Sequence, residues 1–220
     1  MSDAPLLTDL RGRDLGSADL AVPVAHVRDG GILAYPTETV YGFGARCTAE
    51  GVERVRALKG REDDKPFLVL VGSAGDVSDL AWTEDAAELS RIFWPGSLTL
   101  VLRDPRGRFP SGVRSPSGGV AVRVSSHPLV RRLLEELDEP IISTSANPPG
   151  RVAARSGADA HAAGVALGAG SELLVLEMGV LPFSRPSTII DCSGDHALMV
   201  REGTIPLTRL RCAVPHVHDL

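Results

Sequence analysis

Clusters of hydroxyl-bearing side chains follow several apolar runs of this sequence. The first comes after "GILAY", where Pro36 is followed by Thr37, Glu38 and Thr39. Proline has no N–H to donate to a strand ladder, so the sequence predicts that a strand ends here and that a tight loop runs on through Gly44. A turn needs the proline and the glycines, but not three polar side chains in succession. Because loops at the carboxyl ends of strands often carry sites in open α/β folds, this cluster is a candidate for ligand contact.

Two more candidates lie at or near strand ends. The segment "STSAN" follows the apolar pair "II", and its extended spacing gives Ser143, Ser145 and Asn147 one common direction. Arg123 lies inside "VAVRV", where alternation points it to the face opposite its valine neighbours. An arginine in a sheet needs an anion, supplied by the protein or by a ligand. These residue types predict a site for an anionic ligand.

Cations and hydroxyls also recur near the ends of other predicted elements. Lys59, Arg61 and Lys65 begin at the end of a predicted helix, and Ser187 and Arg201 follow in "PST" and "VREG". The lysines and Arg61 could equally complement the helix dipole, which is worth about 0.3–1 kcal/mol. Taken together, these groups suit phosphate, carboxylate and amine groups, and they indicate a cleft that works without a covalent nucleophile.

Other chemistries find little support in the sequence. It contains no GxxxxGK[ST], strand-linked GxGxxG, HExxH or GxSxG motif. His216 and His218 lie in the last few residues, where a frayed tail is the more ordinary interpretation, so no metal site is predicted. The formal net charge of −5 and the aromatic content of 4% do not favour a protein that holds nucleic acid mainly through phosphates or base stacking.

Length and composition predict one domain. The chain has 220 residues, of which 43% are hydrophobic, which is enough for one well-buried core. No apolar run is long enough to span a membrane, and charges interrupt the N-terminus where a signal peptide needs an apolar core. Three cysteines form neither a disulfide framework nor a CxxC pair, so a cytoplasmic location is expected.

Predicted helices and strands alternate along the chain. Helices are expected over residues 18–31, 49–61, 74–82, 83–96 and 127–137, and in part of 151–170, a segment expected to be mobile. Strands are expected over residues 32–37, 65–73, 97–104, 120–126, 140–144, 173–180, 187–194 and 197–203. This order predicts an α/β (α+β) fold, with a twisted mixed parallel and antiparallel sheet, flanking helices and a concave basic cleft. Residues 1–17 are expected to be an irregular arm, 18–207 the domain, and 208–220 a tail.

The motifs in this order resemble the YrdC/TsaC-like threonylcarbamoyl-adenylate synthases, in their single-domain form. The resemblance rests on "YPTETVYGFG", "LKGREDDKPFLVLV", "WPGSLTLVL", "VAVRVSSHPLV", "ISTSAN" and "PSTIID…VREG", which run from about residue 20 to 206. It implies that L-threonine and bicarbonate form a carbamate that attacks the α-phosphorus of ATP, releasing pyrophosphate. A separate transferase complex would then modify tRNA to threonylcarbamoyladenosine, and Mg²⁺ is expected to accompany the ATP.

The resemblance also implies roles for individual residues. L-Threonine would be bound by Thr37, Arg123, Ser143 and Ser187. ATP would be bound by Lys59, Arg61, Lys65, Ser145, Asn147 and Arg201, with Lys59 and Arg61 as the catalytic cations. No protein metal site is implied.

The sequence departs from the family pattern at two places. Glu62 replaces the usual proline after the K-x-R arginine, and "SANPPGRVAARSG" replaces the usual S-A-N-x-S-G run. The second departure leaves the nucleotide contact after Asn147 open among Arg151, Arg155 and Ser156. Two other functions also remain open: a module that binds structured RNA without turnover, and a carbamoyl-transfer domain of the hydrogenase-maturation kind.

Overall fold

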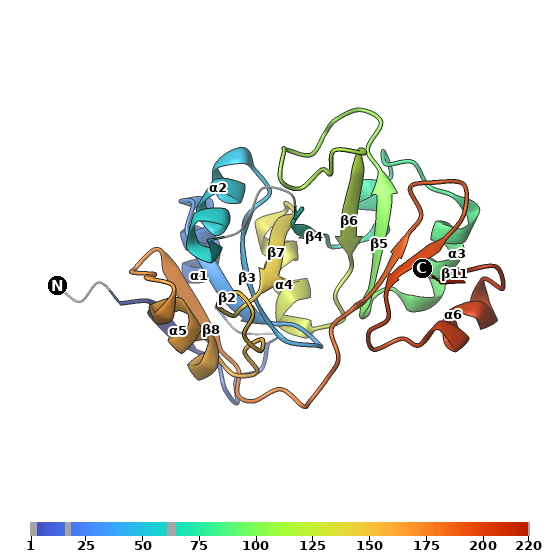
Figure 1. The fold of residues 1–220 in the computed structure, drawn as a ribbon. Coiled ribbons are helices and arrows are strands. Elements are labelled where there is room, and N and C mark those ends of the chain that lie inside the picture. Colours follow the sequence, from blue (N-terminus) through green and yellow to red (C-terminus); the bar gives the residue numbers. More distant parts are fainter. Residues whose placement is uncertain (1–3, 16–18, 61–64, 220) are drawn as a thin grey trace.

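The computed structural model describes residues 4–15, 19–60 and 65–219, and these form one mixed sheet with helices on both faces (Figure 1). The strands are β1 (Leu6–Asp9), β2 (Ile32–Pro36), β3 (Tyr41–Arg46), β4 (Leu68–Leu70), β5 (Leu98–Arg103), β6 (Gly119–Arg123), β7 (Ile141–Ser145), β8 (Leu173–Glu177), β9 (Thr188–Asp191), β10 (Leu198–Arg201) and β11 (His218–Asp219). Their order across the sheet is β1-β8-β2-β3-β7-β4-β6-β5-β9-β10-β11. The α/β class and the mixed sheet are therefore as predicted.

The helices follow the sequence signals for starts and stops. They are α1 (Ala21–Arg28), α2 (Ala49–Lys59), the 3₁₀ turn η1 (Ala74–Val77), α3 (Glu84–Phe93), α4 (Pro128–Leu137), α5 (Gly157–Ala166) and α6 (Leu207–Ala213). Thr48 and Thr83 cap α2 and α3 by accepting hydrogen bonds from Gly51 N and Ala86 N. Proline at the first position of α4 fits the helix start, because its missing N–H would have no helical partner there.

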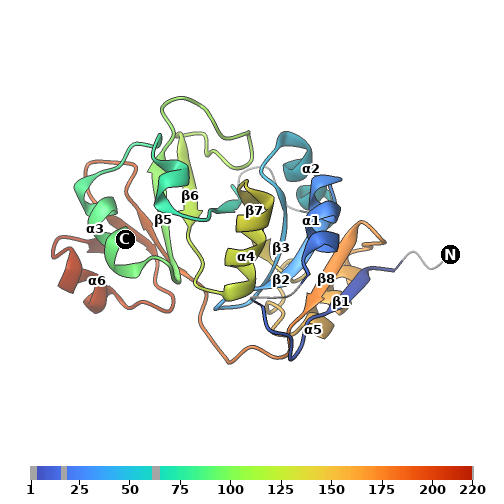
Figure 2. The ribbon, with the colours of Figure 1, turned by 180° about the vertical axis from the view of Figure 1, so that it is seen from behind.

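The two faces of the sheet are covered differently. On one face, buried residues such as Phe43, Leu100 and Val122 pack against α2, α3 and α5. On the other face, Leu33 and Leu70 pack against α1 and α4, which Figure 2 shows in front of the strands. These two helices cover only part of that second face, which therefore continues beyond them.

Strand register identifies the residues on the uncovered part. Ser143 pairs with Gly44 of β3 and Leu68 of β4, and Ala121 and Arg123 follow on β6 with the same parity. Beyond β6 the same face carries Thr99, Ile189 and Arg201. Most of these side chains are small or polar, so this part of the face is a hollow rather than a core layer.

Several predictions from the sequence were wrong in detail. The expected loop from Thr37 to Gly44 contains most of β3, which the sequence did not predict because its glycines are unusual in a strand. Glycine is needed at Gly44, since a Cβ there would lie 2.5 Å from the Ile142 carbonyl oxygen. The N-terminal arm, expected to be irregular, contains β1, which pairs in parallel with β8. The expected tail, residues 208–220, contains β11 and all of α6 except its first residue. The expected helix over residues 74–82 is only the turn η1.

The segment 151–170 is ordered as α5 over ten of its residues. Ser156 caps this helix, since its side chain accepts a hydrogen bond from Asp159 N at 3.0 Å. No helix among the described residues combines the length and apolar character that crossing a membrane requires.

Candidate functional site

A cavity of about 490 Å³ lies over the uncovered part of the sheet. It is lined by Thr37, Thr39, Val40, Gly42, Pro66, Leu68, Thr99, Ala121, Arg123, Ser143, Thr144, Ser145, Asn147, Arg151, Ala153, Pro186, Ser187, Ile189 and Arg201. Within the described part of the chain, this lining includes three arginines and no carboxylate. The site therefore suits an anion that also carries groups able to hydrogen-bond with hydroxyls.

Arg123 is the most buried cation of the cavity, with 3% of its surface exposed. Its Nε donates to the carbonyl oxygen of Gly96 at 3.0 Å, and its Nη2 lies 2.7 Å from Glu38 Oε1. The direction of the second contact is unfavourable for a hydrogen bond, so it is an ion pair and leaves the buried Nη2 without an acceptor. A ligand carboxylate could satisfy such a guanidinium with good geometry.

Glu38 is ionised beside this arginine. Burial works against the charged carboxylate, but the charge of the closely placed Arg123 and the hydrogen bond from Ser125 hold the pKa of Glu38 below its ordinary value. Its Oε2 accepts from Ser125 Oγ at 2.6 Å. The pair therefore partly neutralises the buried guanidinium while leaving it accessible from the cavity.

A second cation, Arg201, lies across the cavity on β10. Its guanidinium donates to the carbonyl oxygen of Ser187 at 2.9 Å and to Ser187 Oγ at 3.2 Å. Thr99 donates its hydroxyl to the same Ser187 oxygen at 3.0 Å. Although Arg201 is exposed, the partial burial of its guanidinium and the charge of Arg123 lower its pKa. The repulsion between these two cations would be relieved by an anion placed between them.

The opposite wall carries hydroxyls. Thr37 Oγ1 donates to the Val40 carbonyl oxygen at 2.7 Å and accepts from the backbone N–H groups of Thr39 and Val40 at 3.2 Å each. Ser143 Oγ accepts from the buried hydroxyl of Tyr35 at 2.8 Å. Burial raises the pKa of Tyr35, so the phenol keeps its proton and remains the donor. Ser143 therefore keeps its own proton for a ligand acceptor.

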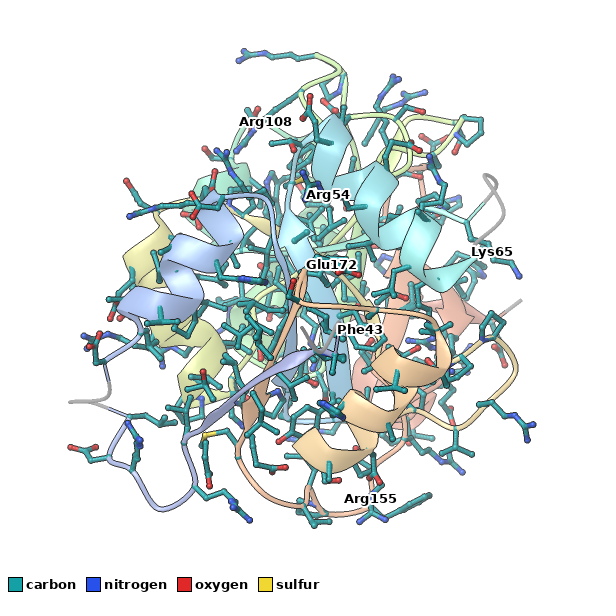
Figure 3. The ribbon with its side chains drawn as sticks, turned by 90° about the vertical axis from the view of Figure 1, so that its left-hand side faces the viewer. Phe43, Arg54, Lys65, Arg108, Arg155 and Glu172 are labelled. Atoms are coloured by element: carbon teal, nitrogen blue, oxygen red, sulfur yellow. The ribbon has the colours of Figure 1, made fainter. Side chains whose placement is uncertain are left out.

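Lys59 supports the site from behind its wall. Its ammonium donates to the carbonyl oxygens of Ser145 (2.9 Å) and Asn147 and to Asn147 Oδ1 (3.1 Å). It also lies 6.0 Å from the centre of the Phe43 ring, which Figure 3 places in the interior between α2 and α5. Lys59 is therefore not part of the lining, and it holds the chain at the end of β7 in place.

The structure brings most of the predicted site residues together. Thr37, Arg123, Ser143, Ser145, Asn147, Ser187 and Arg201 all line the one cavity. Lys65 is exposed and lies beyond the end of α2 (Figure 3), next to Pro66, which does line the cavity. Arg61 lies outside the described residues.

The structure places the three residues that could supply the nucleotide contact after Asn147 at different positions. Arg151 lines the cavity itself. Arg155 lines a neighbouring hollow of about 430 Å³ beside α5, and it donates to the Leu181 carbonyl oxygen at 2.7 Å. The Ser156 hydroxyl oxygen is engaged in capping α5. Arg151 is therefore the best placed of the three to meet a ligand in the main cavity.

Two residues at the site, Thr99 in the lining and Glu38 behind it, could not be assigned from the sequence. Thr99 belongs to an ordinary strand pattern, "SLTLVL", and only the sheet order β6-β5-β9 brings it beside Arg123. Glu38 was conspicuous between two threonines, but its partner Arg123 lies far away along the chain. Both assignments require knowledge of which strands are neighbours.

Comparisons with known proteins identify the family of this chain. The family model Sua5/YciO/YrdC, described as "Telomere recombination", matches residues 25–203. The chain belongs to the Sua5/YciO/YrdC family. It is 35% identical over 182 residues to a Chromohalobacter salexigens protein named threonylcarbamoyl-AMP synthase, covering 81% of this chain and 95% of that one.

Two longer relatives extend the comparison. The Bacillus subtilis threonylcarbamoyl-AMP synthase is 29% identical over 90% of this chain, which spans 57% of that relative's length. The structure of P. abyssi Sua5 complexed with L-threonine superposes with a TM-score of 0.88 at 28% identity, covering 98% of this chain and 62% of that one. The chain therefore spans little more than half the length of these relatives.

Proposed function

We propose that this protein is a nucleotidyltransferase that makes L-threonylcarbamoyl-AMP from L-threonine, bicarbonate and ATP. The observation that carries the proposal is the cavity lining, where three arginines are combined with hydroxyls from two strands and two loops. The described lining residues include no carboxylate. Its relatives named threonylcarbamoyl-AMP synthase, and the related structure that holds L-threonine, support the same assignment.

The amino acid would occupy the side of the cavity near Arg123. The guanidinium would bind the threonine carboxylate, and Thr37, Ser143 and Ser187 would surround the amine and hydroxyl. Such buried hydroxyl partners discriminate against valine or alanine, since those ligands would leave the partners unpaired. Serine would be rejected less strongly, because it differs from threonine by only one methyl group.

ATP would occupy the side defined by Ser145, Asn147 and Arg201. Arg151 adds a cation at the cavity, and Lys59, Arg61 and Lys65 are also proposed to serve ATP binding. Lys59 would act by fixing the Ser145–Asn147 backbone, and Arg61 would be a charge partner for the phosphates. Mg²⁺ would accompany ATP on its phosphate oxygens; among the described residues, no group of three His, Cys, Asp or Glu side chains is placed to hold a metal ion.

The reaction then needs orientation and charge neutralisation rather than a protein nucleophile. The threonine amine adds to bicarbonate with loss of water and gives a carbamate. A carbamate oxygen forms a bond to the α-phosphorus, and the bond from that phosphorus to the bridging oxygen of the β-phosphate breaks, releasing pyrophosphate. Holding two anions together costs electrostatic free energy, which the arginines offset.

The product would be passed to a transferase complex for tRNA modification, and a cytoplasmic location is proposed with that role. The decisive experiment measures pyrophosphate release from ATP with and without L-threonine and bicarbonate. We expect release only when both are present. Pyrophosphate release at the same rate with and without threonine contradicts the proposal. RNA binding without any turnover would favour an RNA-binding module.

A further inference from the structure

We propose that Glu38 is a positioning residue that sets the geometry of the amino-acid side of the cavity by holding Arg123. Its carboxylate links the loop of Thr37 and Thr39 to the guanidinium of Arg123, and it does not contact the ligand. This inference rests on the proposed function and adds a residue that has no role in it so far.

The carboxylate of Glu38 is directed at the end of β6. Its Oε1 lies 2.7 Å from Arg123 Nη2, and its Oε2 accepts from Ser125 Oγ at 2.6 Å. Its Oε1 also accepts a long hydrogen bond, of 3.4 Å, from the backbone N–H of Ser126. Glu38 is absent from the cavity lining, although both neighbouring threonines belong to it. An effect of Glu38 on the ligand must therefore pass through its partners.

The loop that presents Glu38 has little freedom. Thr37 Oγ1 closes the turn by bonding to the backbone of Thr39 and Val40, and the Thr37 N–H donates to the Val40 carbonyl oxygen at 3.0 Å. A turn closed on both sides of Glu38 limits the positions that the carboxylate can take. The threonine hydroxyls and the carboxylate therefore move as one unit.

Arg123 needs this second fixed point. Its Nε is held by the Gly96 carbonyl oxygen at 3.0 Å, but one contact leaves the guanidinium free to rotate about it. Glu38 holds the Nη2 end, and it also offsets a buried charge that lies near Arg201. The orientation and the net charge that a ligand carboxylate meets thus both depend on Glu38.

The test compares Glu38 variants in threonine-dependent pyrophosphate release. Glu38→Ala should raise the KM for threonine by about 10- to 100-fold, because small displacements of a binding group have effects of this size. The KM for ATP should change by less than about threefold, since the nucleotide side keeps its contacts. Glu38→Gln keeps an oxygen that can accept from Ser125 Oγ and a polar group beside Arg123, so it should recover part of the threonine affinity. The matched control is Glu88→Ala, which breaks an exposed pair with Arg91 on α3.

A double-variant cycle separates positioning from direct contact. In an Arg123→Ala background, Glu38→Ala should raise the threonine KM no further, because the group through which it acts is gone. Full additivity overturns the inference. So does an unchanged threonine KM in Glu38→Ala, or an equal rise in both KM values together with a lowered melting temperature.

Two further measurements cover variants that do not fold and a failure of the proposed function. If Glu38→Ala does not fold, Ser125→Ala keeps the Glu38 carboxylate and should still raise the threonine KM while sparing that of ATP. It removes the 2.6 Å hydrogen bond to Glu38, together with the 3.2 Å one that Ser125 Oγ accepts from the His127 N–H. An unchanged threonine KM there overturns the inference. A wild-type protein without threonine-dependent release refutes the proposed function by itself. The positioning role is then judged from crystal structures of Glu38→Ala and Ser125→Ala, or of Ser125→Ala alone if Glu38→Ala does not fold. An Arg123 guanidinium that has not moved in them overturns the role.

Discussion

One face of the sheet is closed at one end and open at the other. At the closed end, Leu33, Tyr35 and Leu70 fill the space beneath α1 and α4. At the open end, strands in continuous register carry Gly42, Ser143 and other small residues, and the cavity lies over them. Strands are paired through backbone hydrogen bonds at both ends, so side-chain size decides where the core ends and the site begins.

The largest expected effect comes from removing the central cation of the open end. Arg123→Ala should lower kcat/KM for threonine by about 100- to 1000-fold, which corresponds to about 3–4 kcal/mol of lost interaction. It also leaves Glu38 without its ion-pair partner, so an intact melting curve must accompany the kinetics. Arg91→Ala removes an exposed arginine of α3 and should change kcat/KM by less than about twofold. Similar kinetics for the two variants would contradict the assignment of the open end.

The next test applies one substitution to two glycines of β3. A Cβ on Gly44 would lie 2.5 Å from the Ile142 carbonyl oxygen and 2.7 Å from the Tyr35 hydroxyl oxygen. Gly44→Ala should therefore destabilise the fold by about 2–3 kcal/mol in urea unfolding.

A Cβ on Gly42 would lie 3.1 Å from Ser143 Oγ and 3.2 Å from the Thr144 carbonyl oxygen, contacts that a small shift can relieve. Gly42→Ala should cost at most about 1 kcal/mol of stability, yet weaken threonine binding, because the added methyl group enters the cavity. Equal stability losses at the two positions would refute the distinction between a packed and an open end.

A smaller effect probes the hydrogen bond that joins the two ends. Tyr35 belongs to the closed end, and its hydroxyl donates to Ser143 Oγ of the open end. Ser143→Ala leaves the Tyr35 hydroxyl buried without its acceptor and should cost about 1–3 kcal/mol of stability. Tyr35→Phe should cost only about 1 kcal/mol, because the freed Ser143 hydroxyl faces the cavity and can bond to water. Thermal unfolding of both variants measures the two losses of stability. A larger loss in Tyr35→Phe than in Ser143→Ala would contradict this account of the hydrogen bond.

The same comparison explains what the sequence could predict. Arg123, Ser143, Ser145 and Asn147 were identifiable because polar residues at buried strand ends are unusual in their local context. The strand β3 could not be predicted, because its glycines normally disfavour a strand. They are needed here because the backbone of β7 approaches β3 closely. Lys59 was predicted to face the nucleotide, yet the structure buries its ammonium among backbone carbonyls of the β7 end, a contact 86 residues away in sequence. Local patterns thus identify candidates, while sheet order decides which of them meet.

The smallest effect concerns the charge that Glu38 supplies at the border of the open end. Its pKa is lower in the folded protein than the ordinary value of 4.5, because Arg123 and Ser125 favour the ionised form over the opposing effect of burial. The stability that this provides is fully present above that ordinary value and is lost as the pH falls through the lower, folded value.

The difference in unfolding free energy between wild type and Glu38→Gln should therefore be largest near neutral pH and shrink below about pH 4. Urea unfolding at about pH 7 and about pH 3 measures it, and the variant difference cancels the contributions of other carboxylates. Glu88→Gln, in the exposed pair of α3, should show a difference below about 0.5 kcal/mol at either pH. If the Glu38→Gln difference stays constant between the two pH values, the carboxylate does not stabilise the border through its charge. The link between Glu38 and Arg123 would then be one of shape alone.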